Sequence, residues 1–321
     1  MSTVAYVFPG QGSQFVGMGH ALATRSRAAA AVFAEADATL AEPISTIAWE
    51  GPADILDRTE HAQPALLATS IAYLAAARER WANAGQPERP PAFLAGHSMG
   101  QYSAMVAGGV ISLGDGMRLV RERGRLMQAS GTDREGRMAA IIGLDDALLP
   151  ELVARAGVHG VFGVANRNSP GQVVVSGERA AVEAAVEIAR ELGARRAIEL
   201  PVSVAAHSPL MTEAASGLRA ILASVSFTDP AVPLLANRDA RLLTTAEASR
   251  EELVEHLTAG VDWVRAVEQM AASGVDTFIE IGPGRVLTGL IKRIVPAATA
   301  IAIDTPSAPD GLALPSMGVP A

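Results

Sequence analysis

Short apolar runs alternate with longer segments of helical periodicity along most of the chain. Runs rich in Val, Ile and Leu predict strands, whereas apolar residues spaced three and four apart predict helices. The predicted strands cover residues 4–8, 92–95, 138–142, 173–176, 197–200, 234–236 and 277–281. The longest predicted helices cover residues 63–82, 111–129 and 180–192. This alternation favours an α/β fold around a largely parallel sheet.

The segment 131–201 differs from its surroundings. It follows a polar turn and is predicted to run strand, helix, strand, helix, strand, which is typical of a compact unit of the split β-α-β kind. We therefore predict an inserted small domain over residues 131–201, and a large α/β domain formed by residues 1–130 and 202–304. One continuous sheet is the alternative. Residues 305–321 are rich in proline and poor in charge, and we predict a disordered tail there.

The composition narrows the chemistry. The 321 residues include no Cys, which excludes a thiolate nucleophile, a disulfide and a zinc site of the Cys type, and we expect no metal. The formal charge is −8, and Lys292 is the single lysine among 26 basic residues, so no basic run is present to bind nucleic acid. The sequence shows no apolar stretch of the ~18 residues that a membrane span needs, and no signal-peptide pattern. We expect a cytoplasmic protein without a membrane partner.

The clearest local motif is GHSMG, residues 96–100, which fits the pattern G-x-S-x-G. It follows the predicted strand 92–95 and precedes a helical pattern over residues 101–108. Glycines at both ends permit a tight turn from strand to helix that presents the Ser98 hydroxyl on a strained corner. The same turn places the Met99 N–H at a helix N-terminus, which favours developing negative charge. A structural turn without catalytic function is the alternative.

A serine nucleophile needs a base within hydrogen-bond reach, and histidine is the usual one. Of the six histidines, His207 ends the apolar run 201–206 and precedes a loop that leads into a helix. Catalytic loops of α/β folds lie in such positions, and serine precedes histidine in the chain order of hydrolase-like sheets. We predict His207 as the base and rank His256 second. The alternative is a buried histidine with no catalytic role.

Six separated segments make the chain resemble the malonyl-CoA:acyl carrier protein transacylase family. They are FPGQGSQ at 8–14, GHSMG at 96–100, RERGRLMQ at 121–128, ANRNSPGQVVVSG at 165–177, the His207 loop, and IGPGRVLTGLIKRI at 281–294. They stand in the family's order and span roughly residues 3–304. The resemblance implies a hydrolase-like large domain with a parallel sheet and an inserted ferredoxin-like small domain.

The resemblance also implies a role for each matching residue. Ser98 would be the acylated nucleophile, and His207 would be its general base and later its general acid. Gln11 and the backbone N–H of Met99 would form the oxyanion hole. His256 falls where the family usually has Gln, at the position whose main-chain carbonyl orients the base.

Arg123 matches the arginine that binds the free carboxylate of the malonyl group. A guanidinium binds a carboxylate through two hydrogen bonds, and leaving it buried beside a neutral acyl group would cost ~2–5 kcal/mol. A surface ion pair with Glu122 is the alternative. Ala206 falls where related polyketide acyltransferases carry larger selectivity residues, so a small side chain there leaves the choice between malonyl and branched groups open.

Together these features predict an [acyl-carrier-protein] S-malonyltransferase of fatty acid or polyketide synthesis, acting through an acyl-serine intermediate. Malonyl-CoA and an acyl carrier protein would be its partners, with the coenzyme A thioester as substrate and no bound cofactor, and we expect a monomer. One alternative is a serine acyl hydrolase or thioesterase that edits acyl carrier proteins. Another is transfer of a non-malonyl acyl group. A scaffold subunit with a degenerate site is disfavoured by the intact site residues.

Carrier docking needs a local basic patch, because acyl carrier proteins are typically acidic and this chain is acidic too. Lys292, with Arg293 beside it and Arg285 nearby, is the candidate patch.

Overall fold

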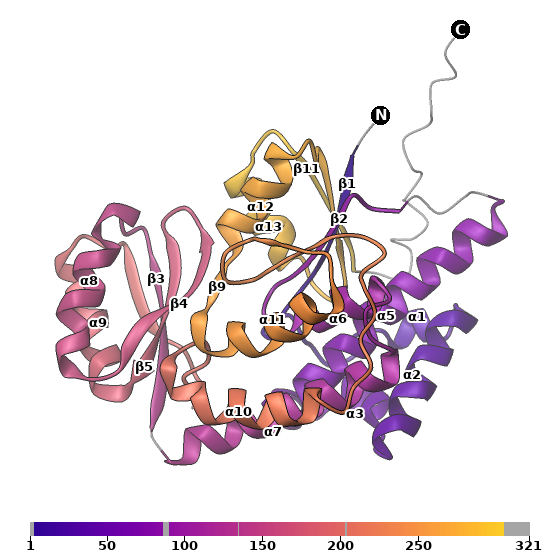
Figure 1. Ribbon diagram of the computed structural model, residues 1–321, viewed down its shortest axis with the longest axis horizontal. Coiled ribbons are helices and arrows are strands. Elements are labelled where there is room, and N and C mark those ends of the chain that lie inside the picture. The colour runs from indigo at the N-terminus through magenta and orange to yellow at the C-terminus, as the bar shows by residue number, and fades with distance from the viewer. Residues whose placement is uncertain (1–2, 86–89, 134, 203, 305–321) are drawn as a thin grey trace, which may run out of the picture.

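The computed structural model describes residues 3–85, 90–133, 135–202 and 204–304, and it contains two β-sheets with helices packed on them (Figure 1). The first sheet has the strand order β11-β10-β1-β2-β7-β8. All neighbouring pairs in it are parallel except β7 and β8. Its strands are β1 (Val4–Phe8), β2 (Phe93–Gly96), β7 (Leu234–Leu235), β8 (Leu242–Leu243), β10 (Thr277–Ile281) and β11 (Thr299–Ile303).

Helices cover both faces of this first sheet. Along β1, Tyr6 and Phe8 join one buried cluster, while Ala5 and Val7 join a second cluster on the opposite face. The first face carries α1 (His20–Ala23), α2 (Arg27–Leu40), α3 (Ile44–Glu50), α4 (Ala53–Leu56), α5 (Thr59–Asn83), α6 (Gly100–Ala107), α7 (Leu113–Asp133), α10 (Thr212–Leu222) and α11 (Ala246–Ala259). The second face carries α12 (Trp263–Ala272) and α13 (Val286–Ile294). Burial on both faces explains why the inner strands β1, β2 and β10 are largely apolar.

The second sheet has the strand order β6-β3-β5-β4-β9. Its strands are β3 (Gly136–Ile142), β4 (Phe162–Ser169), β5 (Gln172–Glu178), β6 (Arg196–Glu199) and β9 (Val261–Asp262). Helices α8 (Leu149–Ala156) and α9 (Arg179–Glu191) pack on it through a third apolar cluster, and Figure 1 shows them at the left end of the molecule. Strand β9 comes from much later in the chain and pairs in parallel with β4, so it joins this sheet to the C-terminal part of the fold.

The seven predicted strands and three long predicted helices are confirmed, with ends that differ by a few residues. The predicted order of segment 131–201 is wrong by one strand, because β4 lies between α8 and β5. Strand β4 carries the polar sequence Asn166-Arg167-Asn168 and two register irregularities, so it lacks the apolar alternation that identifies a strand. Strands β8, β9 and β11 were not predicted either. The predicted tail, residues 305–321, lies outside the described residues.

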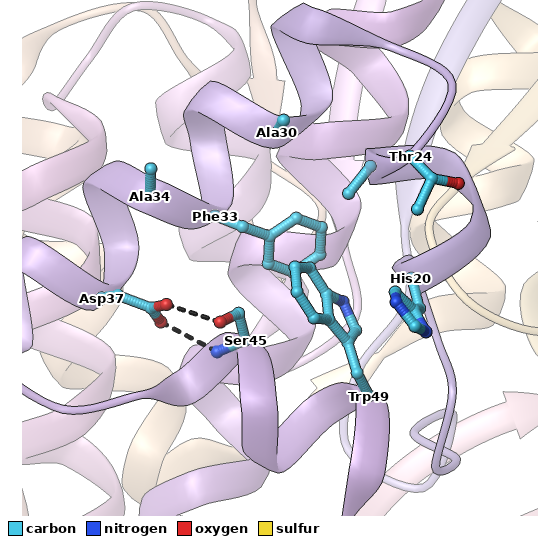
Figure 2. Close-up of a pocket in the computed structure, with 9 residues that line it drawn as sticks. His20, Thr24, Ala30, Phe33, Ala34, Asp37, Ser45 and Trp49 are labelled. Atoms are coloured by element: carbon cyan, nitrogen blue, oxygen red, sulfur yellow. Dashed lines mark hydrogen bonds between the residues drawn. The ribbon is translucent and has the colours of Figure 1, made fainter.

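A hollow of about 260 Å³ lies among α1, α2 and α3, away from the predicted site residues (Figure 2). His20 stacks on Trp49 at 4.9 Å between ring centroids, and the edge of Phe33 meets the same indole. The Asp37 carboxylate accepts hydrogen bonds from the main-chain N–H and the hydroxyl of Ser45. Over the described ranges, the chain has no helix with the length and apolar character to cross a membrane.

Candidate active site

Ser98 sits on the turn between β2 and α6, with a φ of 52° in the left-handed region. Glycine is required on both sides of it. A Cβ on Gly96 would lie 2.0 Å from the main-chain carbonyl of Gly100, and a Cβ on Gly100 would lie 2.2 Å from the main-chain oxygen of Phe8. The backbone is therefore packed too closely for any other residue, and the turn holds the serine in a strained conformation of the kind found at functional sites.

His207 contacts the hydroxyl of Ser98 directly. Its Nε2 lies 2.8 Å from Ser98 Oγ, and its Nδ1 lies 2.6 Å from the main-chain oxygen of His256. A carbonyl only accepts, so Nδ1 carries the proton and the Nε2 lone pair faces the hydroxyl. Burial, and then the charge of Arg123, lower the pKa of His207 to about 3. The imidazole is thus held in the neutral form that accepts a proton.

Arg123 lies inside the molecule, 1% exposed, from the middle of α7. Its Nη2 donates to Ser98 Oγ at 3.1 Å and its Nη1 donates to Gln63 Oε1 at 2.8 Å. The alternative ion pair between Arg123 and Glu122 does not form, because Glu122 pairs with Arg125 instead. Gly124 allows α7 to approach α5 this closely, since a Cβ there would lie 2.7 Å from the main-chain oxygen of Thr59.

The guanidinium of Arg123 has no carboxylate within ion-pair distance among the described residues, and its buried Nε has no hydrogen-bond partner there. Burial lowers the pKa of Arg123 from its usual range. The Arg123 Cζ lies 5.8 Å from the centroid of the Tyr102 ring. The attraction between the cation and the aromatic face offsets part of the cost of burying the charge. A buried cation without a counter-ion is costly, so this arrangement is complementary to an anionic group brought in beside Ser98.

Three further polar residues support the site and escaped the sequence reading: Gln63, Asn237 and Glu252. Asn237 Oδ1 accepts from the main-chain N–H of Ser98 at 2.8 Å, and Glu252 Oε1 accepts from the main-chain N–H of Asn237 at 2.5 Å. Burial raises the pKa of Glu252 to about 8. Gln63 is buried on α5 beside Leu66 and Leu67, and a polar residue among apolar ones was the available sequence signal. Glu252 gave no such signal, because its helical neighbours include Ser249 and His256.

The other residues singled out near the serine lie on its two flanks. Met99 is buried and caps the N-terminus of α6. Gln11 is exposed, and its Nε2 donates to Thr59 Oγ1 at 3.3 Å. It follows Gly10, whose Cβ would lie 2.5 Å from the main-chain oxygen of His97, so this loop abuts the serine turn. Ala206 is half-buried, directly before His207.

The three basic residues predicted for carrier docking lie at the two ends of α13. Lys292 and Arg293 are exposed in its last turn, and Arg293 Nη1 donates to Gln172 Oε1 on β5 at 2.6 Å. Arg285 precedes the helix and forms two hydrogen bonds with Asp304, the shorter at 2.6 Å. Lys292 and Arg293 therefore lie where α13 approaches the second sheet, and the charge of Arg285 is partly compensated.

The site combines a strained serine, a buried neutral histidine hydrogen-bonded to its hydroxyl, and an arginine without a carboxylate partner among the described residues. These features are typical of an acyl-transfer site with a serine nucleophile. The sequence matches the model of the acyl transferase domain over residues 5–304, and the chain belongs to that family.

Three similar proteins carry names that fit this family. The chain is 45% identical to the malonyl CoA-acyl carrier protein transacylase of Escherichia coli strain K12, over 96% of this chain and 98% of that one. The crystal structure of the acyl-carrier-protein-S-malonyltransferase from Bartonella henselae matches with a TM-score of 0.91 and 43% identity, covering 96% and 98% of the two chains. A malonyl-transacylase solved in complex with its type II PKS acyl-carrier protein matches with a TM-score of 0.90, 42% identity, and coverage of 96% and 98%.

Proposed function

We propose that this chain is a malonyl-CoA:acyl carrier protein transacylase, which moves a malonyl group from coenzyme A to the phosphopantetheine thiol of an acyl carrier protein. The observation that carries the proposal is the buried guanidinium of Arg123, without a carboxylate partner among the described residues and 3.1 Å from the Ser98 hydroxyl. The names of full-length relatives at 43–45% identity support the same reaction.

In the first half-reaction, His207 Nε2 takes the hydroxyl proton as Ser98 Oγ attacks the malonyl thioester carbon. The oxyanion that forms is bound by the backbone N–H of Met99 and by Gln11. Collapse breaks the carbon–sulfur bond, and coenzyme A leaves as the thiol with the proton from His207. The product is malonyl-Ser98.

The second half-reaction reverses these steps with a different thiol. The phosphopantetheine thiol gives its proton to His207 and attacks the ester carbonyl of malonyl-Ser98. The same two donors hold the oxyanion. The serine oxygen leaves with the proton from His207, which regenerates the free site and completes a ping-pong cycle.

Arg123 selects the acyl group by binding the free carboxylate at its far end through two hydrogen bonds. An acetyl group leaves the buried cation without its partner, so acetyl transfer is disfavoured. Ala206, next to the base, excludes little volume, so its side chain does not by itself distinguish a malonyl from a branched dicarboxylic group.

The proposal includes the finer organisation of the molecule. Residues 1–130 and 202–304 form a hydrolase-like domain, and residues 131–201 form a ferredoxin-like domain. The β-α-β-β-α-β order from β3 to β6 supports the latter assignment. The enzyme works in the cytoplasm as a monomer, takes the coenzyme A thioester as substrate and needs no resident cofactor. The acidic carrier docks on the patch of Lys292 and Arg293, with Arg285 at its edge.

The test incubates the protein with malonyl-, methylmalonyl-, acetyl- and butyryl-CoA, weighs the intact acyl-enzyme, and then adds holo acyl carrier protein. We expect malonyl on Ser98 and then on the carrier, and no adduct with Ser98→Ala. Equal loading by acetyl-CoA would contradict the role of Arg123. Loss of the acyl group to water, with none on the carrier, would identify a hydrolase instead.

Arg123→Met separates selectivity from the acyl chemistry. Removing one partner of a buried charge pair costs ~2–5 kcal/mol, so kcat/KM for malonyl loading should fall by about 30- to 4,000-fold while acetyl loading does not fall. Arg125→Met is the matched control, since Arg125 lies on the same helix and makes an exposed pair with Glu122. Surface pairs contribute little, and this variant should load malonyl like the parent.

A further inference from the structure

The side chain of His256 makes contacts that the proposed mechanism does not use. Its main-chain oxygen orients His207, but its imidazole is itself fully buried and turns toward Arg123. The His256 Nε2 lies 3.4 Å from Arg123 Nη2, and the ring lies 5.9 Å from the His207 ring. One residue thus contacts both the base and the carboxylate-binding cation.

The surroundings of His256 fix which ring nitrogen carries the proton. Its Nδ1 lies 2.9 Å from the main-chain oxygen of Glu252, which only accepts, so Nδ1 is the donor. Burial, and then the charges of Arg123 and His207, hold the pKa of His256 well below its usual range, so the ring is neutral. The Nε2 lone pair is therefore available to accept from Arg123 Nη2.

Besides Ser98 Oγ, two neutral acceptors therefore hold the guanidinium. Gln63 Oε1 accepts from Nη1 and His256 Nε2 accepts from Nη2, so the plane of the group is fixed from two of its nitrogens. Neither acceptor carries negative charge. An aspartate or glutamate in either place would neutralise the cation and compete with an incoming carboxylate, whereas neutral acceptors orient the cation and leave its charge for the substrate.

We propose that the His256 imidazole is a positioning residue for acyl-group selection, holding Arg123 in the orientation that receives the substrate's free carboxylate. The inference rests on the proposed function and goes beyond the main-chain contact with His207. It assigns to the side chain a contribution to malonyl recognition that is separable from proton transfer at Ser98.

The experiment compares His256→Leu with His256→Gln. Leucine approximates the size of the ring and keeps the main-chain oxygen for His207, but it removes the acceptor. Glutamine restores an acceptor oxygen. We expect His256→Leu to raise KM for malonyl-CoA by about 10-fold with a smaller change in kcat, as loss of one hydrogen bond to a charged group predicts. Acetyl-CoA loading should be unchanged, and His256→Gln should stay within about threefold of the parent.

Controls separate this contribution from a packing defect. His61→Leu replaces a histidine whose ring nitrogens contact the Ile55 main-chain oxygen and the Glu42 carboxylate, and it should leave all loading rates unchanged. The rate at which phenylmethanesulfonyl fluoride labels Ser98 reports on the serine and its base without any carboxylate, and it should be the same in all four proteins.

The possible results are distinct. Equal losses of malonyl loading, acetyl loading and sulfonyl labelling in His256→Leu would overturn the inference in favour of a purely structural role. Unchanged malonyl kinetics in that variant would overturn it as well, as would failure of glutamine to rescue. If the parent protein loads no malonyl at all, the proposed function fails first, and that result is recognisable without any variant.

Discussion

Ser98 and His207, the two residues between which the proposed mechanism moves a proton, both have positive φ values, 52° and 59°. Such conformations are costly for residues other than glycine and persist where the surrounding structure holds them. Here the Asn237 side chain accepts a hydrogen bond from the main-chain N–H of Ser98, and the main-chain oxygen of His256 accepts one from the His207 ring. The reacting atoms are positioned by backbone geometry as much as by rotamer choice.

The pH dependence of loading follows from the low pKa of His207. The base is active when neutral, and its pKa of about 3 leaves it neutral throughout the mildly acidic range. A histidine at its ordinary pKa of ≈ 6.5 would lose about 25-fold in kcat/KM between about pH 7 and pH 5, whereas we expect less than about a twofold loss. Stopped-flow or quenched-flow malonyl loading measures this, and circular dichroism at each pH confirms that the protein is folded. An acid limb centred near 6.5 would contradict the assignment.

At the residue scale, the sequence was sufficient to select the candidate residues that lie in local motifs, and the structure brings Ser98 and His207 together. Ser98 was identified by its flanking glycines, and His207 by the loop that follows an apolar run. Gln63, Asn237 and Glu252 were missed, because each acts through a partner at least 15 positions away, and no local pattern records such contacts. The sequence likewise could not show that Arg123 and Glu122 occupy different faces of the helix and do not pair.

The serine turn gives a prediction at the scale of one element. Gly100→Ala places a Cβ 2.2 Å from the backbone of β1, where nothing flexible can move away, so we expect unfolding free energy to fall by about 3 kcal/mol or more. Gly289→Ala is the matched control in α13, since no atom lies within 4 Å of its Cβ position. Alanine favours helix over glycine, and this variant should gain about 0.5–1 kcal/mol.

Urea denaturation followed by tryptophan fluorescence measures both glycine variants against the parent. Gly100→Ala recovered only as insoluble protein would agree with the prediction. A change of similar size and sign in the two variants would contradict it, because the predicted effect of each substitution depends on the atoms that its new methyl group contacts.

Strands β4, β8 and β9, three of the four strands that were not predicted, depend on pairing rather than on a local pattern. Strands β8 and β9 have two residues each, too short for any period to be visible. Strand β4 has length but not apolarity, since it takes its place by pairing with β5 on one side and β9 on the other. Such strands form because other segments pair with them, and a local sequence pattern does not show that pairing. Strands β1 and β10 are recognisable from the sequence because both of their faces are buried and their residues are mostly apolar.

At the scale of the whole molecule, segments far apart in the chain hold the second sheet against the rest of the fold. Strand β9, from the C-terminal part of the chain, pairs with β4 inside the second sheet. His97 Nε2, beside Ser98, lies 2.9 Å from Asn168 Oδ1 of β4, and Arg293 of α13 donates to Gln172 of β5. These contacts lie close to the serine turn and to the end of α13. The proposed carrier patch therefore occupies the junction of the two sheets rather than the surface of one of them.

The docking proposal gives a prediction at this scale. The chain has a formal charge of −8, so Lys292→Glu would add repulsion where an acidic carrier is proposed to dock. We expect KM for the carrier to rise by on the order of 10-fold at low salt, and malonyl loading from coenzyme A to stay unchanged. The effect should shrink as ionic strength rises. Steady-state transfer assays at two salt concentrations measure it. Arg118→Glu is the control, since Arg118 is exposed on α7 and pairs with Asp115.

Parallel losses with coenzyme A and with carrier would contradict carrier docking and indicate that the patch binds the phosphates of coenzyme A. No change with either substrate would place the carrier elsewhere.

The hydrogen bond from Arg123 to the Ser98 hydroxyl has a consequence for the design of covalent inhibitors. A neutral serine-directed electrophile that enters this site displaces that donor and leaves the cation buried beside an uncharged adduct. An electrophile that carries an acid group at the distance of a malonyl carboxylate supplies the missing anion at the same time as it captures the oxygen. Selective reagents for this enzyme should therefore be small acids with a reactive carbonyl, boron or phosphorus centre, rather than the uncharged reagents used for serine hydrolases at large.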